Sequence, residues 1–196
     1  MKTGKPPHSM YFVGIVCPGE LDKKVHQFKI WMLEHYGCKV ALRSPAHITL
    51  VPPFWFDESG EDLLLQTLSS FHSDARELVV GLNDFSHFSK RVLFIQILYN
   101  NGLNIIKSAT ELHFRRSLGD IIKLDDRPFT PHITIANRDL KPSDFIKAWE
   151  HFSKKSFDDS FHTSHISLLK LGTEKWNVIA EKNWMLKYPE IKNDHP

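Results

Sequence analysis

The spacing of apolar residues in the first part of the chain predicts a strand followed by an amphipathic helix. Residues 11–16 are mostly β-branched or aromatic and end just before Pro18-Gly19, as a strand that stops at a turn does. Apolar side chains then recur at helical spacing as far as Gly37, a residue type that commonly ends helices. The apolar positions are Leu21, Val25, Phe28, Met32 and Tyr36.

A second strand and a second helix follow. Residues 40–42 precede the alternating run His47-Ile48-Thr49-Leu50, and the pair Pro52-Pro53 predicts the end of that strand. Residues 61–71 then predict a helix. Its expected inner face carries Leu64, Leu65 and Leu68.

The middle of the chain predicts a hairpin and a long helix. Residues 76–82 and 91–99 have strand composition and are joined by a polar turn around residues 86–90. Residues 101–118 then show apolar positions in loose helical register. We expect Leu103, Ile106, Leu112 and Leu118 to face the core.

The last third repeats this strand–helix pattern and adds two strands. The breaker-rich segment D-D-R-P-F-T-P at residues 125–131 leads into the strand His132-Ile133-Thr134-Ile135. Ser143, after Pro142, predicts the N-cap of a helix that runs to about Lys154. Residues 161–171 and 175–184 predict two strands joined by a turn at residues 172–174.

The predicted order β-α-β-α-β-β-α-β-α-β-β indicates an α+β protein built from two similar halves. No low-complexity linker separates these halves, so we expect residues 1–196 to form a single domain with two lobes. The first nine residues are expected to be a flexible leader, and residues 187–196 a polar tail.

The composition indicates an ordinary globular protein. Hydrophobic residues make up 41% and charged residues 24% of the chain, and the net charge of +2 is too small to predict tight nonspecific binding to a polyanion. Cys17 and Cys38 have no metal-binding or disulfide spacing, so we expect a reducing, cytoplasmic location. The chain contains neither a signal-peptide pattern nor an apolar run of the ~20 residues that a membrane helix needs, and no membrane association is predicted.

One short phrase occurs twice, each time with a proline just upstream. It reads His47-Ile48-Thr49-Leu50 after Pro45-Ala46, and His132-Ile133-Thr134-Ile135 after Pro131. Twelve His and eight Thr residues predict about half of one His-x-Thr by chance, so two copies followed by an aliphatic residue are unusual. The looser match His165-Ile166-Ser167-Leu168 lacks the proline, and we interpret it as a chance occurrence.

The repeated residues suit acid–base chemistry at phosphorus. In a strand, the His and Thr of each phrase share one face while the aliphatic residues share the other. If the two strands face one cleft, one imidazole can take a proton from a nucleophile while the other gives a proton to a leaving oxygen. The threonine hydroxyls can donate hydrogen bonds to nonbridging phosphate oxygens. No metal or cofactor is required.

Other chemistries are less well supported by the sequence. Simple amphipathic strands would also alternate in this way. A zinc or iron site would need further ligands, and neither phrase has an acidic residue or second histidine at a suitable short spacing. The chain lacks a Gly-x-Ser-x-Gly elbow, a Gly-x-Gly-x-x-Gly motif and a P-loop.

The segments S-P-A-H-I-T-L-V-P-P-F and R-P-F-T-P-H-I-T-I-A-N-R resemble the two-histidine phosphoesterase superfamily. This superfamily includes 2′-5′ RNA ligase and cyclic phosphodiesterase relatives, and it carries one His-x-Thr/Ser-x motif in each lobe. The resemblance covers about residues 10–185 in element order, including the opening strand Y-F-V-G-I-V-C-P. It implies a bilobal α+β fold in which two antiparallel sheets with outer helices surround a central cleft.

The resemblance also implies roles for particular residues. His47 and His132 would be the acid–base pair, and Thr49 and Thr134 would bind the phosphate. By analogy with hydrolysing members, His132 would be the base and His47 the acid. One difference is that Ala46 separates proline from histidine only in the first motif, so the two histidines need not be interchangeable.

Further residues near the motifs are candidates for substrate contacts. Arginines close to each motif could meet the phosphate, and nearby aromatic residues could stack on a base. The candidates are Arg43, Arg127, Arg138, Phe54, Trp55 and Phe129. Residues His87, Lys90 and Arg91 could guide a polyanion, but a solvated hairpin end is the favoured explanation for them.

The resemblance favours a metal-independent phosphodiesterase that opens 2′,3′-cyclic phosphates of RNA ends or nucleotides. A noncatalytic module that binds a nucleotide or RNA end is one alternative. Formation of a 2′-5′ linkage between RNA ends, the reverse chemistry in the same site, is another. No obligate protein partner is predicted.

Overall fold

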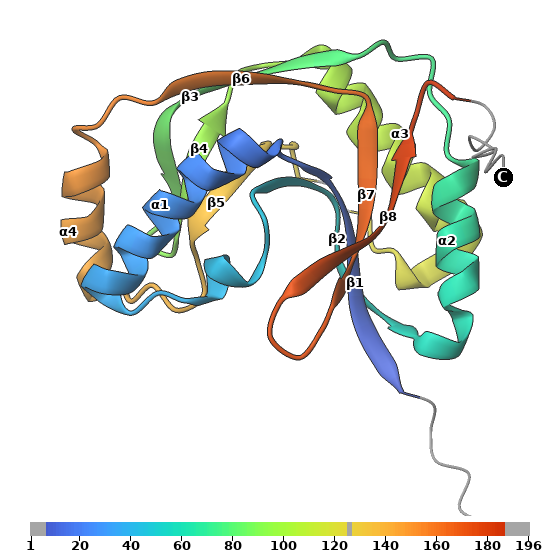
Figure 1. The fold of residues 1–196 in the computed structure, drawn as a ribbon, viewed down its shortest axis with the longest axis horizontal. Helices are drawn as coiled ribbons and strands as arrows, with labels where there is room; N and C mark the ends of the chain where they lie inside the picture. The colour runs from blue at the N-terminus through green and yellow to red at the C-terminus, as the bar shows by residue number, and fades with distance from the viewer. Residues whose placement is uncertain (1–6, 125–126, 187–196) are drawn as a thin grey trace, which may run out of the picture.

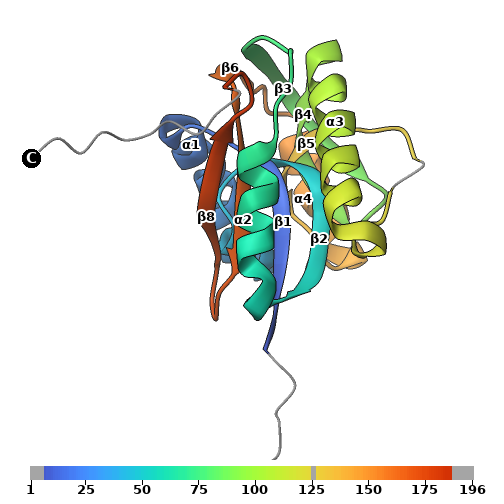
Figure 2. The same ribbon diagram turned by 90° about the vertical axis from the view of Figure 1, so that its right-hand side faces the viewer.

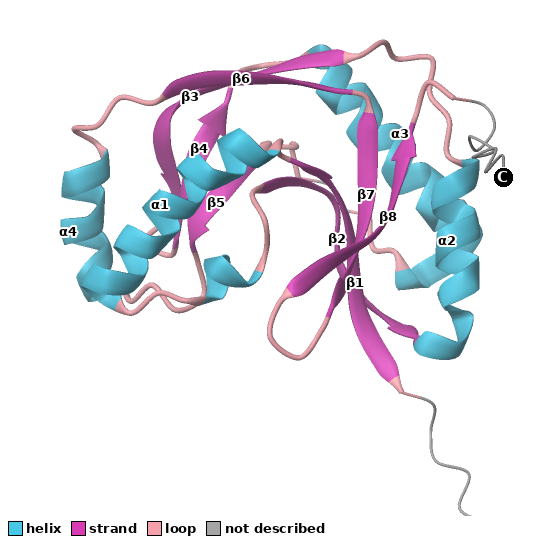
Figure 3. Cartoon of the chain, in the orientation of Figure 1, coloured by secondary structure: helices cyan, strands magenta, loops and turns pink. Residues whose placement is uncertain are grey.

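The computed structural model of the protein describes residues 7–124 and 127–186. These residues form two four-stranded antiparallel sheets and four α-helices, which confirms the predicted α+β class (Figures 1 and 3). The strands are β1 (His8–Val16), β2 (His47–Asp57), β3 (Leu78–Phe88), β4 (Val92–Ile97), β5 (His132–Ala136), β6 (Asp158–Thr163), β7 (His165–Leu171) and β8 (Trp176–Asn183). The helices are α1 (Gly19–Tyr36), α2 (Glu61–Ser70), α3 (Asn101–Leu118) and α4 (Pro142–Phe152).

The two sheets have matching topologies that place the repeated phrase in equivalent positions. The first sheet has the strand order β2-β1-β7-β8 and the second has the order β5-β4-β3-β6. Each His-Ile-Thr phrase therefore opens an edge strand, β2 or β5, and each edge strand pairs with one inner neighbour, β1 or β4. The two edge strands also contact each other, so the motifs meet where the sheets adjoin.

Helices α1 and α3 each cross from one sheet to the other. Each helix follows a strand of one sheet and packs beside the other sheet. Helix α1 follows β1 of the first sheet, but its Phe28 packs edge-on against Phe85 of β3, with ring centroids 5.1 Å apart. Phe152 of α4 packs on the same Phe85 at 4.8 Å. Helix α3 follows β4 of the second sheet and instead contacts β2 and α2 beside the first sheet (Figure 2).

Pro52 and Pro53 do not end the first motif strand, so this prediction was wrong. Strand β2 continues to Asp57 because it is an edge strand, where residues without an N–H are tolerated. Tyr11 pairs with Phe54 and Val13 pairs with Val51, so the two prolines lie opposite a single residue of β1 in an irregular, bulge-like step.

The chain start is more ordered than we expected. His8 and Ser9 of the expected leader belong to β1, where they pair with Asp57 and Phe56. The rest of the expected leader up to residue 6, and the expected tail at residues 187–196, lie outside the described residues.

The predicted hairpin and the helix that follows it are present with shifted details. Strand β3 extends to Phe88, so residues 86–88 are strand and the turn lies at residues 89–91. His87 of this hairpin packs edge-on against Phe145 and Trp149 of α4 instead of facing solvent freely. In α3, Leu112 is 45% exposed, and Thr110 and Phe114 occupy the buried face in its place.

Two predictions near the chain end also require correction. Residues 161–171 are two strands, because the chain passes from the second sheet to the first at Ser164, between β6 and β7. Ser143 is not the N-cap of α4: Lys141 precedes the helix, and Pro142 is its first residue. The turn at residues 172–174 is confirmed, with the Gly172 N–H donating to the Lys175 carbonyl.

The core contains residues from both sheets and from all four helices in one continuous cluster. The buried Trp184 indole donates to the Ala75 carbonyl at 2.9 Å and fixes the end of β8 beside the segment before β3. Within the described ranges 7–124 and 127–186, no helix is long and apolar enough to cross a membrane.

We expect the chain to unfold as one cooperative unit, because α1 and α3 connect the two sheets through buried contacts. Tryptophan fluorescence monitors both sheets, because Trp31 lies on α1 and Trp184 follows β8. In a single cooperative transition, the fluorescence should change at the same urea concentration as the far-UV circular dichroism. Two separate transitions would contradict a single domain and would indicate lobes that fold independently.

Candidate active site

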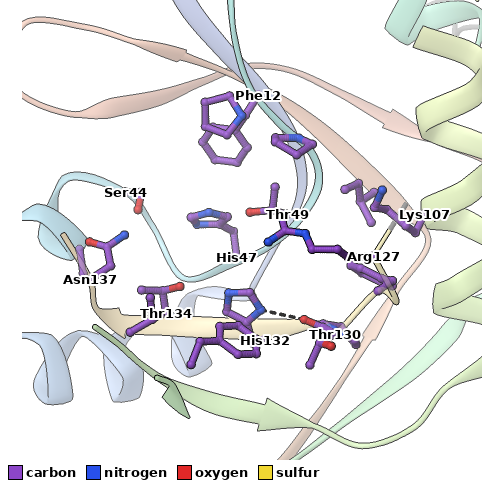
Figure 4. Close-up of a pocket in the computed structure, with 18 of the residues that line it drawn as sticks. Phe12, Ser44, His47, Thr49, Lys107, Arg127, Thr130, His132, Thr134 and Asn137 are labelled. Carbon is purple, nitrogen blue, oxygen red and sulfur yellow. Dashed lines mark hydrogen bonds between the residues drawn. The ribbon is translucent and has the colours of Figure 1, made fainter. Parts of the chain in front are cut away.

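A cavity of about 800 Å³ brings the two repeated phrases together. His47 and Thr49 line it from β2, and His132 and Thr134 line it from β5 (Figure 4). All four side chains are half-buried, whereas the aliphatic residues Ile48, Leu50, Ile133 and Ile135 are fully buried on the opposite faces. The predicted alternation is thus confirmed, and both histidine–threonine pairs border one space.

The His47 imidazole is held by a main-chain carbonyl. Its Nδ1 lies 2.8 Å from the Pro45 carbonyl oxygen. Because a carbonyl oxygen can only accept, Nδ1 carries the proton, and Nε2 is the nitrogen left for exchange with a ligand. The Phe12 ring of β1 lies 4.7 Å from the imidazole and packs edge-on against Trp176 at 4.7 Å, which limits rotation of the imidazole.

His132 has the same arrangement in the other sheet. Its Nδ1 lies 2.8 Å from the Thr130 carbonyl oxygen, the contact drawn as a dashed line in Figure 4. Phe88 and Phe94 lie 4.9 Å from the ring on the second sheet. Both histidines therefore donate from Nδ1 to the carbonyl two residues earlier, and both leave Nε2 as the reactive nitrogen.

The alanine inserted in the first motif is accommodated by contacts with α1. The Ala46 N–H donates to Asp22 Oδ1 at 2.6 Å, and the Cys17 N–H donates to the Ala46 carbonyl at 2.9 Å. Lys29 is 2% exposed, and its ammonium donates to the Ser44 carbonyl at 2.9 Å. Asp22 and Lys29 thus fix the segment that presents the Pro45 carbonyl to His47.

The strand beside the first motif must lack a side chain at Gly14. A Cβ placed there would lie 2.8 Å from the Ile48 carbonyl oxygen and 3.2 Å from the Phe12 ring. Gly14 pairs with Thr49, so this close approach sets the position of the first motif relative to Phe12.

Burial makes both histidines harder to protonate. It lowers the pKa of His47 from its ordinary value of 6.5 to about 4, against the opposing effect of the hydrogen bond to Pro45. The positive charges of Lys29 and of protonated His132 lower the His47 pKa further, while Asp22 raises it. Burial also lowers the pKa of His132, and the hydrogen bond to Thr130 opposes that shift. The pKa of Lys29 is itself lowered by burial to about 8.

Three of the additional candidates border the cavity. Arg127 and Phe129 lie just before β5, and Arg138 lies just after it. The guanidinium groups of the two arginines supply positive charge at both ends of the second motif strand, where a phosphate or its neighbours could be bound.

The other three candidates do not line the cavity. Arg43 donates from Nε to the Glu174 carbonyl at 2.8 Å and does not line the cavity. Phe54 is buried and stacks on Tyr11 in the core, with ring centroids 6.2 Å apart. Trp55 is 58% exposed and does not contribute to the cavity lining.

Several lining residues were missed by the sequence analysis. They include Phe12 and Trp176 from the first sheet, Ser44 and Asn137, and Lys107, Ser108 and Glu111 of α3. The buried Lys29 had a usable signal, since it lies on the same helical face as Val25 and Met32, where a lysine is out of place. No pattern in α3 distinguishes the polar side chains that face the cavity from those that face solvent.

The Asn137 side-chain oxygen is a polar atom without a partner among the described residues. It is buried, and Asn137 lies at the far end of the cavity from Arg127 and Lys107 in Figure 4. A buried acceptor of this kind usually has a partner, so it marks a place for a ligand donor or a water molecule. The described part of the chain contains no cluster of three or more His, Cys, Asp or Glu side chains that could hold a metal ion.

The chance match at His165 lies outside the cavity. His165 is exposed at the start of β7 and does not contribute to the lining. Its position is consistent with our interpretation of this phrase as accidental, and it provides a natural control for substitutions of the other two histidines.

The two sheets and the shared cavity lined by two His-x-Thr strands define a protein of the two-histidine phosphoesterase type. The chain belongs to the family described as the 2′-5′ RNA ligase superfamily, whose sequence profile matches residues 17–175. No curated protein matches the chain.

Several solved structures share the fold at low sequence identity. Escherichia coli LigT complexed with 3′-AMP superposes with a TM-score of 0.63 at 18% identity, covering 90% of this chain and 98% of that one. TT0787 of Thermus thermophilus gives 0.62 at 16% identity, with the same coverages of 90% and 98%. The MHV ns2 PDE domain gives 0.50 at 12% identity, covering 84% and 100%.

The low pKa of His47 should make folding stability depend on pH. Between about pH 6.5 and pH 4, the unfolded chain protonates His47 while the folded protein does not, so the free energy of unfolding decreases as the pH falls through this window. His47→Gln removes this titration. We expect the wild type to lose ~1–2 kcal/mol more than His47→Gln between about pH 7 and pH 5 in urea unfolding. Equal losses would contradict a His47 that stays neutral in the folded protein.

Proposed function

We propose that the protein is a metal-independent phosphodiesterase that opens 2′,3′-cyclic phosphates of RNA ends or nucleotides. Membership of the superfamily supports a phosphodiesterase-type enzyme in general. The observation that carries the finer proposal is the pairing of two imidazoles, each anchored through Nδ1, at one cavity that is also lined by two threonines.

The geometry suits in-line attack of water on a cyclic phosphate. The Nε2 atom of one histidine takes a proton from a water molecule while the oxygen of that water forms a bond to phosphorus. The other histidine gives a proton from Nε2 to the ribose oxygen as its bond to phosphorus breaks, which leaves a phosphate monoester and a free hydroxyl. Thr49 and Thr134 donate hydrogen bonds to the nonbridging oxygens, where negative charge increases in the transition state.

The order of acid and base is part of this proposal. The resemblance assigns His132 as base and His47 as acid. The unliganded cavity favours the reverse order, because burial lowers the pKa of His47 to about 4 and the charge of Lys29 lowers it further, which makes His47 the harder ring to protonate. A bound phosphate adds negative charge beside both rings and raises the pKa of each. Because the charge on one ring also lowers the pKa of the other, the two histidines titrate as a coupled pair.

A nucleotide substrate is supported by the relatives of this fold. The LigT structures include complexes with 3′-AMP, NADP⁺ and ATP, which are all phosphate-containing nucleotides. In this chain, Arg127 and Arg138 place positive charge at the cavity, which suits an anionic ligand.

Product analysis tests the proposal directly. The protein would be incubated in chelator with 2′,3′-cyclic mononucleotides and with a short RNA carrying the same end, and the products identified by phosphorus NMR. We expect 2′- or 3′-phosphomonoesters. Joined RNA would instead support the ligation alternative, and binding without any product would support a noncatalytic module.

Substitution of either motif histidine should slow the reaction strongly. Loss of one proton-transfer group from an acid–base pair typically costs about 10²–10⁴-fold in rate, or ~3–5 kcal/mol. We expect this loss in kcat for His47→Ala and for His132→Ala. His165→Ala is the matched control, because it changes an exposed histidine in a similar phrase and should leave kcat unchanged. Full activity in either motif variant would refute the acid–base assignment.

A further inference from the structure

The cavity extends beyond the histidines toward α3. In Figure 4, Lys107 and Arg127 lie on one side of His47 and His132, while Ser44 and Asn137 lie on the other. On the α3 side, the lining also includes Glu111 and Phe129. We call this end, formed by Lys107, Glu111, Arg127 and Phe129, the α3 arm. It is the part of the cavity with both an aromatic wall and charges of both signs.

Lys107 and Glu111 form an unusually shielded pair on α3. The ammonium nitrogen lies 2.7 Å from Glu111 Oε1, and each side chain is only 12% exposed. By contrast, Lys154 and Glu150 form a pair of the same spacing on α4 with exposures of 71% and 68%. The Lys107 ammonium also lies 5.6 Å from the centre of the Phe129 ring, so the pair and the ring share one wall.

Stabilisation of α3 does not explain this pair. A lysine placed four residues before a glutamate is the less favourable order on a helix, and removing charges from water has a desolvation cost. Glu111 Oε1 is solvent-inaccessible and has no well-directed hydrogen bond among the described residues, although the ammonium is near it. The charge of Lys107 holds the carboxylate through this oxygen, and both side chains line the cavity, where a ligand can contact the pair.

We infer that the α3 arm binds the base of the nucleotide, and that Lys107 and Glu111 select guanine. This inference rests on the proposed function, since it identifies the base of a substrate whose phosphate lies at His47 and His132. The hydrogen-bonding edge of guanine presents one acceptor, O6, beside two donors, N1–H and N2–H. The Lys107 ammonium donates to O6, and the Glu111 carboxylate accepts from N1–H and N2–H, so adjacent partners of opposite charge match adjacent groups of the base.

The other bases satisfy fewer of these groups. Adenine and cytosine offer one amino donor next to a ring acceptor, so the carboxylate receives one hydrogen bond instead of two. Uracil has a single N3–H between two carbonyl oxygens, and these oxygens repel the second carboxylate oxygen. A matched pair of hydrogen bonds to a base discriminates roughly 10–100-fold against a base that lacks one of them.

Binding measurements with nucleotides that are not turned over test the inference. Calorimetry would give the Kd of the wild type for the 2′- and 3′-monophosphates of guanosine and of uridine. Of the two guanosine monophosphates, the one with the lower Kd should bind at least about 10-fold more tightly than the uridine monophosphate with its phosphate in the same position. Glu111→Gln, which puts an amide donor where an acceptor is needed, should reduce this ratio to about 1–3.

Two further variants complete the test. Glu150→Gln makes the same substitution in the exposed pair of α4, and it should preserve the wild-type ratio. Lys107→Gln removes the cation beside O6, and it should lower the ratio even if Glu111→Gln proves unstable. A wild-type ratio below about 2, or a ratio unchanged in both α3 variants, would overturn the inference.

The outcomes separate this inference from the proposed function. If all four nucleotides bind equally and cyclic phosphates are still hydrolysed, the proposed function stands and the base assignment is wrong. If none of the nucleotides binds and no cyclic phosphate is opened, the proposed function fails and the base assignment fails with it.

Discussion

The hydrogen bond from each motif imidazole to a main-chain carbonyl is the contact on which the site depends. His47 donates to Pro45 and His132 donates to Thr130, in each case to the residue two positions earlier. These bonds fix which nitrogen carries the proton in the neutral ring and which one remains for substrate. The inserted Ala46 changes only the identity of the accepting residue, and α1 anchors the altered segment through Asp22 and Lys29.

The fold brings these two local arrangements together. Each motif opens an edge strand, and the two edge strands adjoin because α1 and α3 each pack on the sheet opposite to their own preceding strand. Edge strands also tolerate the irregular approach that the site needs, as the double proline of β2 shows. The aromatic rings beside each histidine then exclude water and lower the pKa of both rings.

The sequence predicted those features that local periodicity determines. The bounds of α3 and the alternation in both motif strands were correct, because spacing alone specifies which face is apolar. The sequence did not reveal that the chain passes from the second sheet to the first at Ser164, because the residues on both sides of this point have the composition of strands. Phe54 and Trp55 follow an irregular step in β2 and do not line the cavity. Lys107 and Glu111 were missed because tertiary packing alone decides which polar face of α3 borders the cavity.

The central claim is that His47 and His132 act together through their Nε2 atoms on one phosphate. Nitrogen-15 NMR of the two side chains, recorded with and without a nucleoside 3′-monophosphate, tests it most directly. The account predicts that both neutral rings carry the proton on Nδ1 in the free protein, and that both Nε2 resonances shift together when the nucleotide binds. A ring with its proton on Nε2, or a nucleotide that shifts only one of the two rings, would contradict it.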